Sequence, residues 1–387
     1  MKLKKLISLS LAAVLLTGCS GQSAQTQTSA AQTTVAETEN METETAETQA
    51  AEAENTMTAP AKAVAQPGAN RGNGSDETNE PSAQEHEGPD RRNGDGAFRQ
   101  GNGGGTIDKS GDETLNTLLA ETQEKFTQID YTDETTGKSF AYNFFIPDGY
   151  DESQEYPLVL FITDSSVVGK ETTAALTQGY GALVWVTDED QQKHPSFVIA
   201  PEFPENILVG EGTASEYVDA LLNLLASVQE TYQIDENRIY ITGQSMGCMT
   251  ALYLNGTYPD LFAASLYVDG QWSTDILSPL EEQTFFYFAA EGDERASTGM
   301  QNVIDMFDAD GVSYGKSILN AKDSEETIAQ RVADVIAQEY SANFVSWEKG
   351  SVLPDDMDGF EGNEHMYSFD HPYKISVLRD WLFEQVK

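Results

Sequence analysis

The chain has 387 residues and a formal net charge of −42, because 64 acidic residues outnumber 22 lysines and arginines. A negative field of this size repels nucleic acid and other acidic polymers, so neither is expected as a partner. The two cysteines and four histidines form no CxxC or HExxH pattern, and we therefore expect no metal and no other cofactor.

The N-terminus has the organisation of an export signal. Three lysines within the first five residues precede an apolar stretch, residues 6–16, which is too short to span a bilayer as a mature helix. The following Leu16-Thr17-Gly18-Cys19 resembles the lipobox of bacterial lipoproteins, in which the signal is cut before a cysteine that carries the lipid. The resemblance implies a signal peptide over residues 1–18, a membrane anchor on Cys19 and a place in the bacterial cell envelope, outside the cytoplasm. An ordinary secretory signal with an incidental cysteine is the alternative.

Residues 19–112 are predicted to form a disordered tether. Up to about Thr106 they contain hardly any bulky apolar side chain and are rich in Ala, Thr, Gln and Glu, then in Gly, Asn and charge. Such a segment cannot bury enough apolar surface to offset the entropy of ordering it. We expect the remaining residues, 113–387, to form one large α/β domain and a monomer.

The domain alternates strand and helix patterns along the chain. Strands are expected within 139–150, 156–163, 196–204, 238–243, 263–269, 284–293 and 342–348. Helices are expected over 213–232, 246–258, about 298–308, 323–339 and 375–386. Continuous apolar strands that alternate with helices predict a doubly wound, mostly parallel sheet, whose ligand sites lie at the carboxyl ends of the strands.

The stretch Gly243-Gln244-Ser245-Met246-Gly247 stands between a predicted strand and a predicted helix. This G-x-S-x-G pattern in that context is typical of a nucleophile elbow, where a sharp turn leaves room for little beyond hydrogen at the two glycines. The serine hydroxyl then projects above a helix N-terminus, whose dipole favours a developing negative charge. Cys248, in the first turn of that helix, is expected to be a packing residue.

A serine nucleophile needs a histidine base and an orienting acid, which follow it along the chain in the order acid, then histidine. Asp293 ends the second strand after the elbow and is the preferred acid, with Asp269, one strand earlier, as the alternative. His365 and His371 both follow the last strand and precede the last helix, whereas His194 precedes the elbow and is in the wrong order.

Residues from about 126 to 387 resemble the esterase and "predicted peptidase" branch of the α/β-hydrolases, related to polyhydroxybutyrate depolymerases and feruloyl esterases. The matching stretches are "YPLVLFI", "FVIAPEFPE", "ENRIYITGQSMGCMTALYLNGTYPDLFAASLYVDG", "FFYFAAEGDE" and "EHMYSFDHPYKISVLRDWLF". The resemblance implies that Ser245 is the nucleophile and Asp293 the acid. It favours His365 as the base, because the family's histidine stands some fifteen residues before the terminal "DWL" and His365 stands sixteen before Trp381.

The position of His365 in its loop also favours it over His371. His365 follows the glycine- and acid-rich segment "DDMDGFEGNE", from which a loop can reach across the sheet edge, whereas His371 is followed at once by Pro372 and the final helix. The adjacent Glu364 is expected to be a solvated neighbour, since Asp293 already supplies the orienting carboxylate.

The oxyanion hole is where this chain departs from the family. The family usually has His-Gly after the strand "LVLFL", whereas this chain has Thr163-Asp164-Ser165-Ser166. We expect the N–H of Met246 as one donor and the backbone of Asp164 or Ser165 as the other. In that arrangement the Asp164 side chain turns toward a loop N–H or a polar substrate.

Gln244, Gln271 and Trp272 are candidates for the substrate pocket, although the last two equally fit the packing of a loop. Taken together, the sequence predicts a lipid-anchored serine hydrolase that cleaves a small or polymer-linked ester. A peptidase of the same fold is one alternative. A non-catalytic tethered binding protein on a degenerate hydrolase fold is the other.

Overall fold

The computed structural model describes residues 107–210, 213–355, 357 and 364–387. The predicted signal peptide, Cys19 and most of the predicted tether lie outside these residues. Within them, no helix combines the length and the apolar character needed to cross a membrane.

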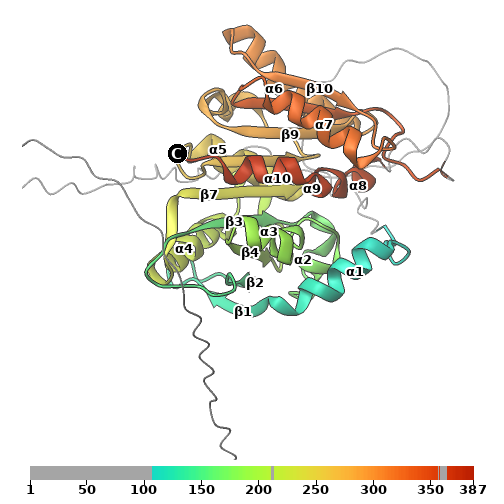
Figure 1. Cartoon of the computed structure of the whole chain (residues 1–387). Coiled ribbons are helices and arrows are strands. Elements are labelled where there is room, and N and C mark those ends of the chain that lie inside the picture. Colours follow the sequence, from blue (N-terminus) through green and yellow to red (C-terminus); the bar gives the residue numbers. More distant parts are fainter. Residues whose placement is uncertain (1–106, 211–212, 356, 358–363) are drawn as a thin grey trace, which may run out of the picture. The chain divides into compact units, whose positions relative to one another are not determined.

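Nine strands of the described part form one sheet in the order β1-β2-β4-β3-β7-β8-β9-β11-β10 (Figure 1). Their bounds are β1 Thr127–Thr132, β2 Ser139–Phe145, β3 Tyr156–Ile162, β4 Phe197–Glu202, β7 Ile234–Gln244, β8 Ala264–Val268, β9 Phe285–Ala290, β10 Gly315–Leu319 and β11 Ala342–Trp347. β2 pairs antiparallel with both β1 and β4, and every other pairing in this sheet is parallel. The prediction of a mostly parallel sheet is confirmed. A separate antiparallel pair joins β5 (Leu208–Gly210) to β6 (Thr213–Ala214).

Helices cover both faces of the large sheet. Their bounds are α1 Glu113–Thr122, α2 Ala174–Thr177, α3 Asp188–Lys193, α4 Glu216–Thr231, α5 Met246–Thr257, α6 Glu294–Asp310, α7 Glu325–Ile336, α8 Glu364–Ser368, α9 Asp370–Lys374 and α10 Ser376–Phe383. Short 3₁₀ helices occupy Gln123–Lys125, Ser165–Val167, Val184–Val186, Thr274–Ile276 and Ser278–Glu282. Buried residues of α4, α5 and α6 form one core with the sheet, and those of α1, α2, α7, α9 and α10 form the other. Figure 1 views the sheet from the side of α10.

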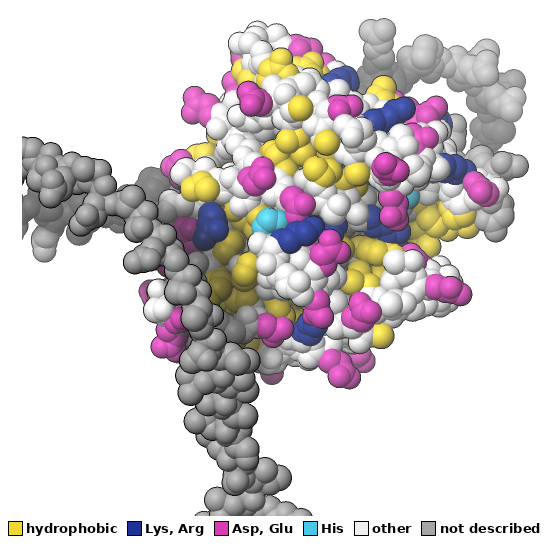
Figure 2. Space-filling view, in the orientation of Figure 1, with side chains coloured by type: hydrophobic (Ala, Val, Ile, Leu, Met, Phe, Trp, Pro, Cys, Tyr) yellow, Lys and Arg dark blue, Asp and Glu magenta, His cyan; other side chains and the backbone are white. Residues whose placement is uncertain are grey.

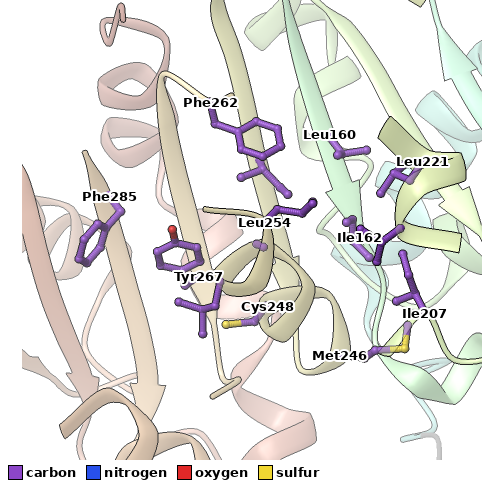
Figure 3. Close-up of a cluster of buried hydrophobic side chains, with 14 of the residues drawn as sticks. Leu160, Ile162, Ile207, Leu221, Met246, Cys248, Leu254, Phe262, Tyr267 and Phe285 are labelled. Atoms are coloured by element: carbon purple, nitrogen blue, oxygen red, sulfur yellow. The ribbon is translucent and has the colours of Figure 1, made fainter. Parts of the chain in front are cut away.

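Strand β3 is apolar at nearly every position because both faces of the sheet are covered there. Leu158, Leu160 and Ile162 belong to the core beneath α4 and α5, whereas Val159 and Phe161 belong to the core on the opposite face. Successive side chains of a strand point to opposite faces, so a strand covered on both sides needs an apolar residue at every position. Figure 3 shows the first of these cores, in which Cys248 lies buried among apolar side chains, as predicted.

Every strand and helix expected from the sequence is present, with ends that differ by a few residues. Nine helices and strands of the described part were not predicted: α1, α2, α3, α8, α9, β1, β5, β6 and β10. The strands β1 and β10 lie at the two edges of the sheet, where only one side is paired and several side chains are exposed, so their sequences are mixed rather than apolar. Helix α6 starts directly at Glu294, a turn earlier than expected.

Acidic side chains are scattered over the face in Figure 2, with apolar groups and a smaller number of basic ones between them. They are not gathered into one patch on this face. A dispersed arrangement of acidic groups, as on this face, suits solubility better than recognition of one particular cation.

Candidate active site

Ser245 stands on a tight turn between the end of β7 and the start of α5. Its φ of 52° and ψ of −113° are rare for a residue with a side chain, and its N–H donates to the carbonyl of Val268 over 3.0 Å. A Cβ at Gly247 would overlap the carbonyl oxygen of Ile162, and one at Gly243 would lie within 2.7 Å of the Gly247 carbonyl oxygen. The two glycines therefore serve the close backbone approach that the sequence pattern predicted.

His365 brings its imidazole to this serine from α8, 120 positions further along the chain. Its Nε2 lies 2.8 Å from Ser245 Oγ, and its Nδ1 is hydrogen-bonded to Oδ2 of Asp293. The ring of Phe369 packs edge-on against the imidazole at 4.9 Å between centroids. The structure thus places the three predicted side chains in one hydrogen-bonded line, serine to histidine to aspartate.

Asp293 is fixed by the helix that follows it. It is the N-cap of α6, where its Oδ1 accepts the N–H groups of Arg295 and Ala296, each over 3.2 Å. The other oxygen, Oδ2, is left for His365. One carboxylate therefore caps a helix and orients the imidazole, and the rigid cap holds it in place.

The pKa of His365 is raised above its ordinary value. Burial of the imidazole alone acts in the opposite direction, because it disfavours the charged ring. The hydrogen bond and negative charge of Asp293 outweigh this effect, with smaller contributions from Asp269 and Asp164. The surroundings thus favour an imidazolium, which is the form a general base takes after it accepts a proton.

The structure keeps the alternative candidates away from Ser245 Oγ. The ring of His371 packs against Trp347 at 5.2 Å between centroids, and burial lowers its pKa to about 4. His194 pairs with Asp380 over 2.9 Å and stacks on Phe383. Neither histidine is the imidazole at the serine.

Asp269 is fully buried at the end of β8, and its Oδ1 accepts the N–H of Ala290 over 2.8 Å. It is Asp293, not Asp269, that His365 Nδ1 contacts. Burial raises the pKa of Asp269 to about 7, and the nearby charge of Asp293 acts in the same direction.

Met246 and Asp164, two of the residues expected at the oxyanion hole, lie next to the elbow. Met246 is the first residue of α5, where helix N–H groups have no acceptor within the helix. Asp164 turns its side chain inward: Oδ1 accepts the N–H of Ser166 over 2.7 Å, and Oδ2 accepts Nε2 of Gln244 over 3.0 Å. The carboxylate is therefore directed to a loop N–H, one of the two orientations expected, and Ser165 is the exposed residue that follows it.

A cavity of about 290 Å³ lies next to these groups. Gln244 is adjacent to the serine in sequence, Met366 is adjacent to His365, and Phe369 contacts the imidazole. The remaining walls combine apolar and polar residues, namely Ile107, Lys109, Ser110, Leu115, Asn116, Leu119, Asp164, Ser166, Val167, Lys170, Ala174, Thr177 and Gln178. The N-terminal part of the described chain, including α1, thus forms one side of the cavity.

Of the three predicted pocket residues, only Gln244 lines this cavity within the described part of the chain. Trp272 is 4% exposed, and its ring packs edge-on against Tyr253 in the core beneath α5. Gln271 lies against Gly299 of α6. Both positions agree with the packing role that was the alternative for these two residues.

The expectation for Glu364 is wrong. This residue is 2% exposed rather than solvated, and its carboxylate accepts backbone N–H groups from Gly292 and Gly350. Both partners are distant in sequence, so no local pattern could have revealed the contact. Gln178, which contacts Gln244 over 3.1 Å, was missed for the same reason.

The sheet order and the elbow after β7 define the α/β-hydrolase fold. Residues 134–274 match the model of a family described as "Putative esterase", and the resemblance to the esterase branch of this superfamily is confirmed. No curated protein matches the chain.

Among solved structures, the chain is similar to a thermostable esterase, with 23% identity and a TM-score of 0.54 over 69% of this chain. The match covers 64% of that esterase, so the chain corresponds to less than two thirds of its length. The feruloyl esterase module from Clostridium thermocellum matches at 13% identity and a TM-score of 0.46, over 68% of this chain and 90% of that one. An S-formylglutathione hydrolase from Staphylococcus aureus matches at 13% identity and a TM-score of 0.39, over 67% and 98%.

Proposed function

We propose that this protein is a serine hydrolase that cleaves carboxylic esters, with Ser245 as nucleophile, His365 as general base and Asp293 as the orienting acid. The observation that carries the proposal is the line of hydrogen bonds from Ser245 Oγ through both nitrogens of His365 to Asp293. A matching esterase family and an esterase of similar fold support the same chemistry.

In the acylation step, Ser245 Oγ attacks the ester carbonyl carbon while its proton passes to Nε2 of His365. The tetrahedral oxyanion is stabilised by the N–H of Met246 and by a backbone N–H of Asp164 or Ser165. When the intermediate collapses, the bond to the alcohol oxygen breaks, and the imidazolium returns its proton to that oxygen. Asp293 stabilises the imidazolium in both steps and is not itself protonated.

Water completes the cycle. His365 takes a proton from a water molecule, whose oxygen attacks the acyl carbon, and Ser245 Oγ leaves with the proton that the imidazolium returns. The cavity beside Gln244 and Phe369 receives one part of the ester. Its mixed lining suits a group that is apolar along its length and carries a polar substituent.

The proposal also includes the location of the enzyme. A lipid on Cys19 would hold the catalytic domain outside the cytoplasm of a bacterium, with the tether predicted over residues 19–112 as the connection. Growth with an alkyne-labelled fatty acid tests this part: the wild-type protein should incorporate the label, and Cys19→Ala should not.

Reaction with a fluorophosphonate probe, followed by mapping of the modified residue, tests the catalytic assignment. Ser245 should be the labelled serine, and Ser245→Ala should abolish both labelling and the hydrolysis of short p-nitrophenyl esters. The matching p-nitroanilides distinguish an esterase from a peptidase, since an esterase should cleave them far more slowly. Labelling at another serine would refute the assignment.

A further inference from the structure

Glu364 is a buried carboxylate that the catalytic cycle above does not use. It is 2% exposed, and it directly precedes His365 in the chain. Its Oε2 accepts the N–H of Gly292 and its Oε1 accepts the N–H of Gly350, each over 3.0 Å. Hydrogen bonds to an ionised acceptor are stronger than those between neutral groups, and a buried carboxylate is costly without them.

The two partners of Glu364 lie where they control the geometry of the site. Gly292 follows β9 and directly precedes Asp293. Gly350 follows β11, at the point where the chain leaves the sheet on its way to α8. The Glu364–Gly292 bond therefore joins the residue before the base to the residue before the acid, beside the His365–Asp293 bond itself.

The Glu364 carboxylate occupies the space that a side chain at Gly292 would need. A Cβ at Gly292 would overlap the Glu364 carboxyl group, so only glycine leaves room for it. The bond to Gly350 joins two residues that are 14 positions apart. Gly350 lies just after β11 and Glu364 is the first residue of α8, so the bond ties the start of α8 to the end of β11. The bonds at Glu364 thus fix the start of α8 to two strand ends, independently of the residues in between.

We propose that Glu364 is a positioning residue, which holds Nδ1 of His365 against Asp293 and Nε2 against Ser245. The proposal rests on the proposed function for its effect on turnover. It predicts that loss of the Glu364 carboxylate lowers kcat through a displaced imidazole, with little effect on the binding of substrate. A displacement of about 1 Å in a catalytic group lowers rates by about 100-fold, so we expect a loss of about 10- to 100-fold.

The test compares Glu364→Gln with Glu294→Gln, an exposed glutamate next to Asp293 that serves as the matched control. The amide keeps the size of the side chain but presents an NH₂ to one of the two N–H donors. Gly292→Ala is a second, independent variant, in which Glu364 is retained and its carboxylate is expelled. The measurements are kcat and KM for a p-nitrophenyl ester, the fraction of sites titrated by a fluorophosphonate, and the low-field proton NMR signal of His365 Nδ1–H.

The expected result for Glu364→Gln and Gly292→Ala is a 10- to 100-fold lower kcat per titrated site, a KM within about twofold of wild type, and a broadened low-field signal. Glu294→Gln should match the wild type in all three. An unchanged kcat per titrated site, even with a lower melting temperature, would make Glu364 merely structural and overturn the proposal. So would an unchanged NMR signal. If the wild type itself neither hydrolyses esters nor reacts with the probe, the proposed function fails, while the NMR comparison still tests whether Glu364 holds His365.

Discussion

Asp293 is expected to have two separable functions, because its two carboxylate oxygens have different partners. Oδ1 accepts the N–H groups of Arg295 and Ala296, and Oδ2 accepts Nδ1–H of His365. In Asp293→Asn, we expect the single amide oxygen to face the helix N–H groups, because those groups can only donate and need an acceptor. The amide NH₂ then faces Nδ1 and favours the tautomer with its proton on Nε2, which cannot accept the proton of Ser245.

Because the two oxygens have different partners, the expected losses of activity and of stability can be estimated separately. Loss of the correct tautomer should lower kcat by about 10⁴-fold, which is about 5 kcal/mol of activation free energy. Asp293→Ala removes the cap of α6 as well, and a lost N-cap costs about 1 kcal/mol of stability. The two variants should therefore share the low kcat, whereas Asp293→Ala should be less stable than Asp293→Asn by about 1 kcal/mol.

Steady-state hydrolysis of p-nitrophenyl acetate gives kcat, and urea denaturation followed by tryptophan fluorescence gives the free energy of unfolding. Asp305→Asn, at an exposed position on the same helix, is the control and should leave both values close to wild type. The reasoning is refuted if Asp293→Asn keeps more than about a tenth of the wild-type kcat, since the lost tautomer should cost about 10⁴-fold. Equal stabilities of the asparagine and alanine variants would refute the part that concerns the cap.

Three further predictions concern the histidines, a buried acid and the N-terminal segment. His365→Ala should lower kcat by about 10⁴- to 10⁶-fold, whereas His371→Ala should reduce only the stability; the reverse pattern in kcat assays would contradict the choice of base. Asp269 binds its proton more tightly when folded, with a pKa of about 7 against 3.8, so stability should fall as pH rises through this range. Asp269→Asn should therefore gain stability over wild type between pH 4 and pH 7, by on the order of 1–4 kcal/mol in urea denaturation, and a constant difference would contradict this. A chain beginning at residue 113 lacks the 2.6 Å ion pair between Lys109 and Asp370. Its melting temperature should therefore be about 2–4 °C below that of a chain beginning at residue 107, and equal melting temperatures would contradict this prediction.

The tight turn at Ser245 could be predicted from sequence because its signal is local. Ser245 and its two glycines lie within five residues, between a strand and a helix that the apolar pattern identifies. The positions of Asp293 and His365 relative to the strands were also readable, since the order of elements fixes which loops meet at the sheet edge. Their hydrogen bonds to one another depend on side-chain directions, which the sequence pattern does not contain.

The burial of Glu364 could not be predicted from the sequence. An acidic residue after a polar, glycine-rich segment has the composition of an exposed loop, and its two N–H partners lie 72 and 14 positions away. Burial of a charge depends on such distant partners, so no periodicity reveals it. The edge strands β1 and β10 escaped prediction for a related reason, because half-exposed strands lack the continuous apolar signal of central ones.

The backbone at Ser245 has a consequence for how such a sequence can change over time. A residue held at a φ of 52° and a ψ of −113° costs on the order of 1–3 kcal/mol, and glycine would relieve most of it. Under the proposed function, selection for stability and selection for turnover therefore act in opposite directions at this single position. A descendant freed from the need to turn over substrate would gain stability by exchanging this serine for glycine. Under the proposed function, the serine is retained only while its chemistry is useful to the cell.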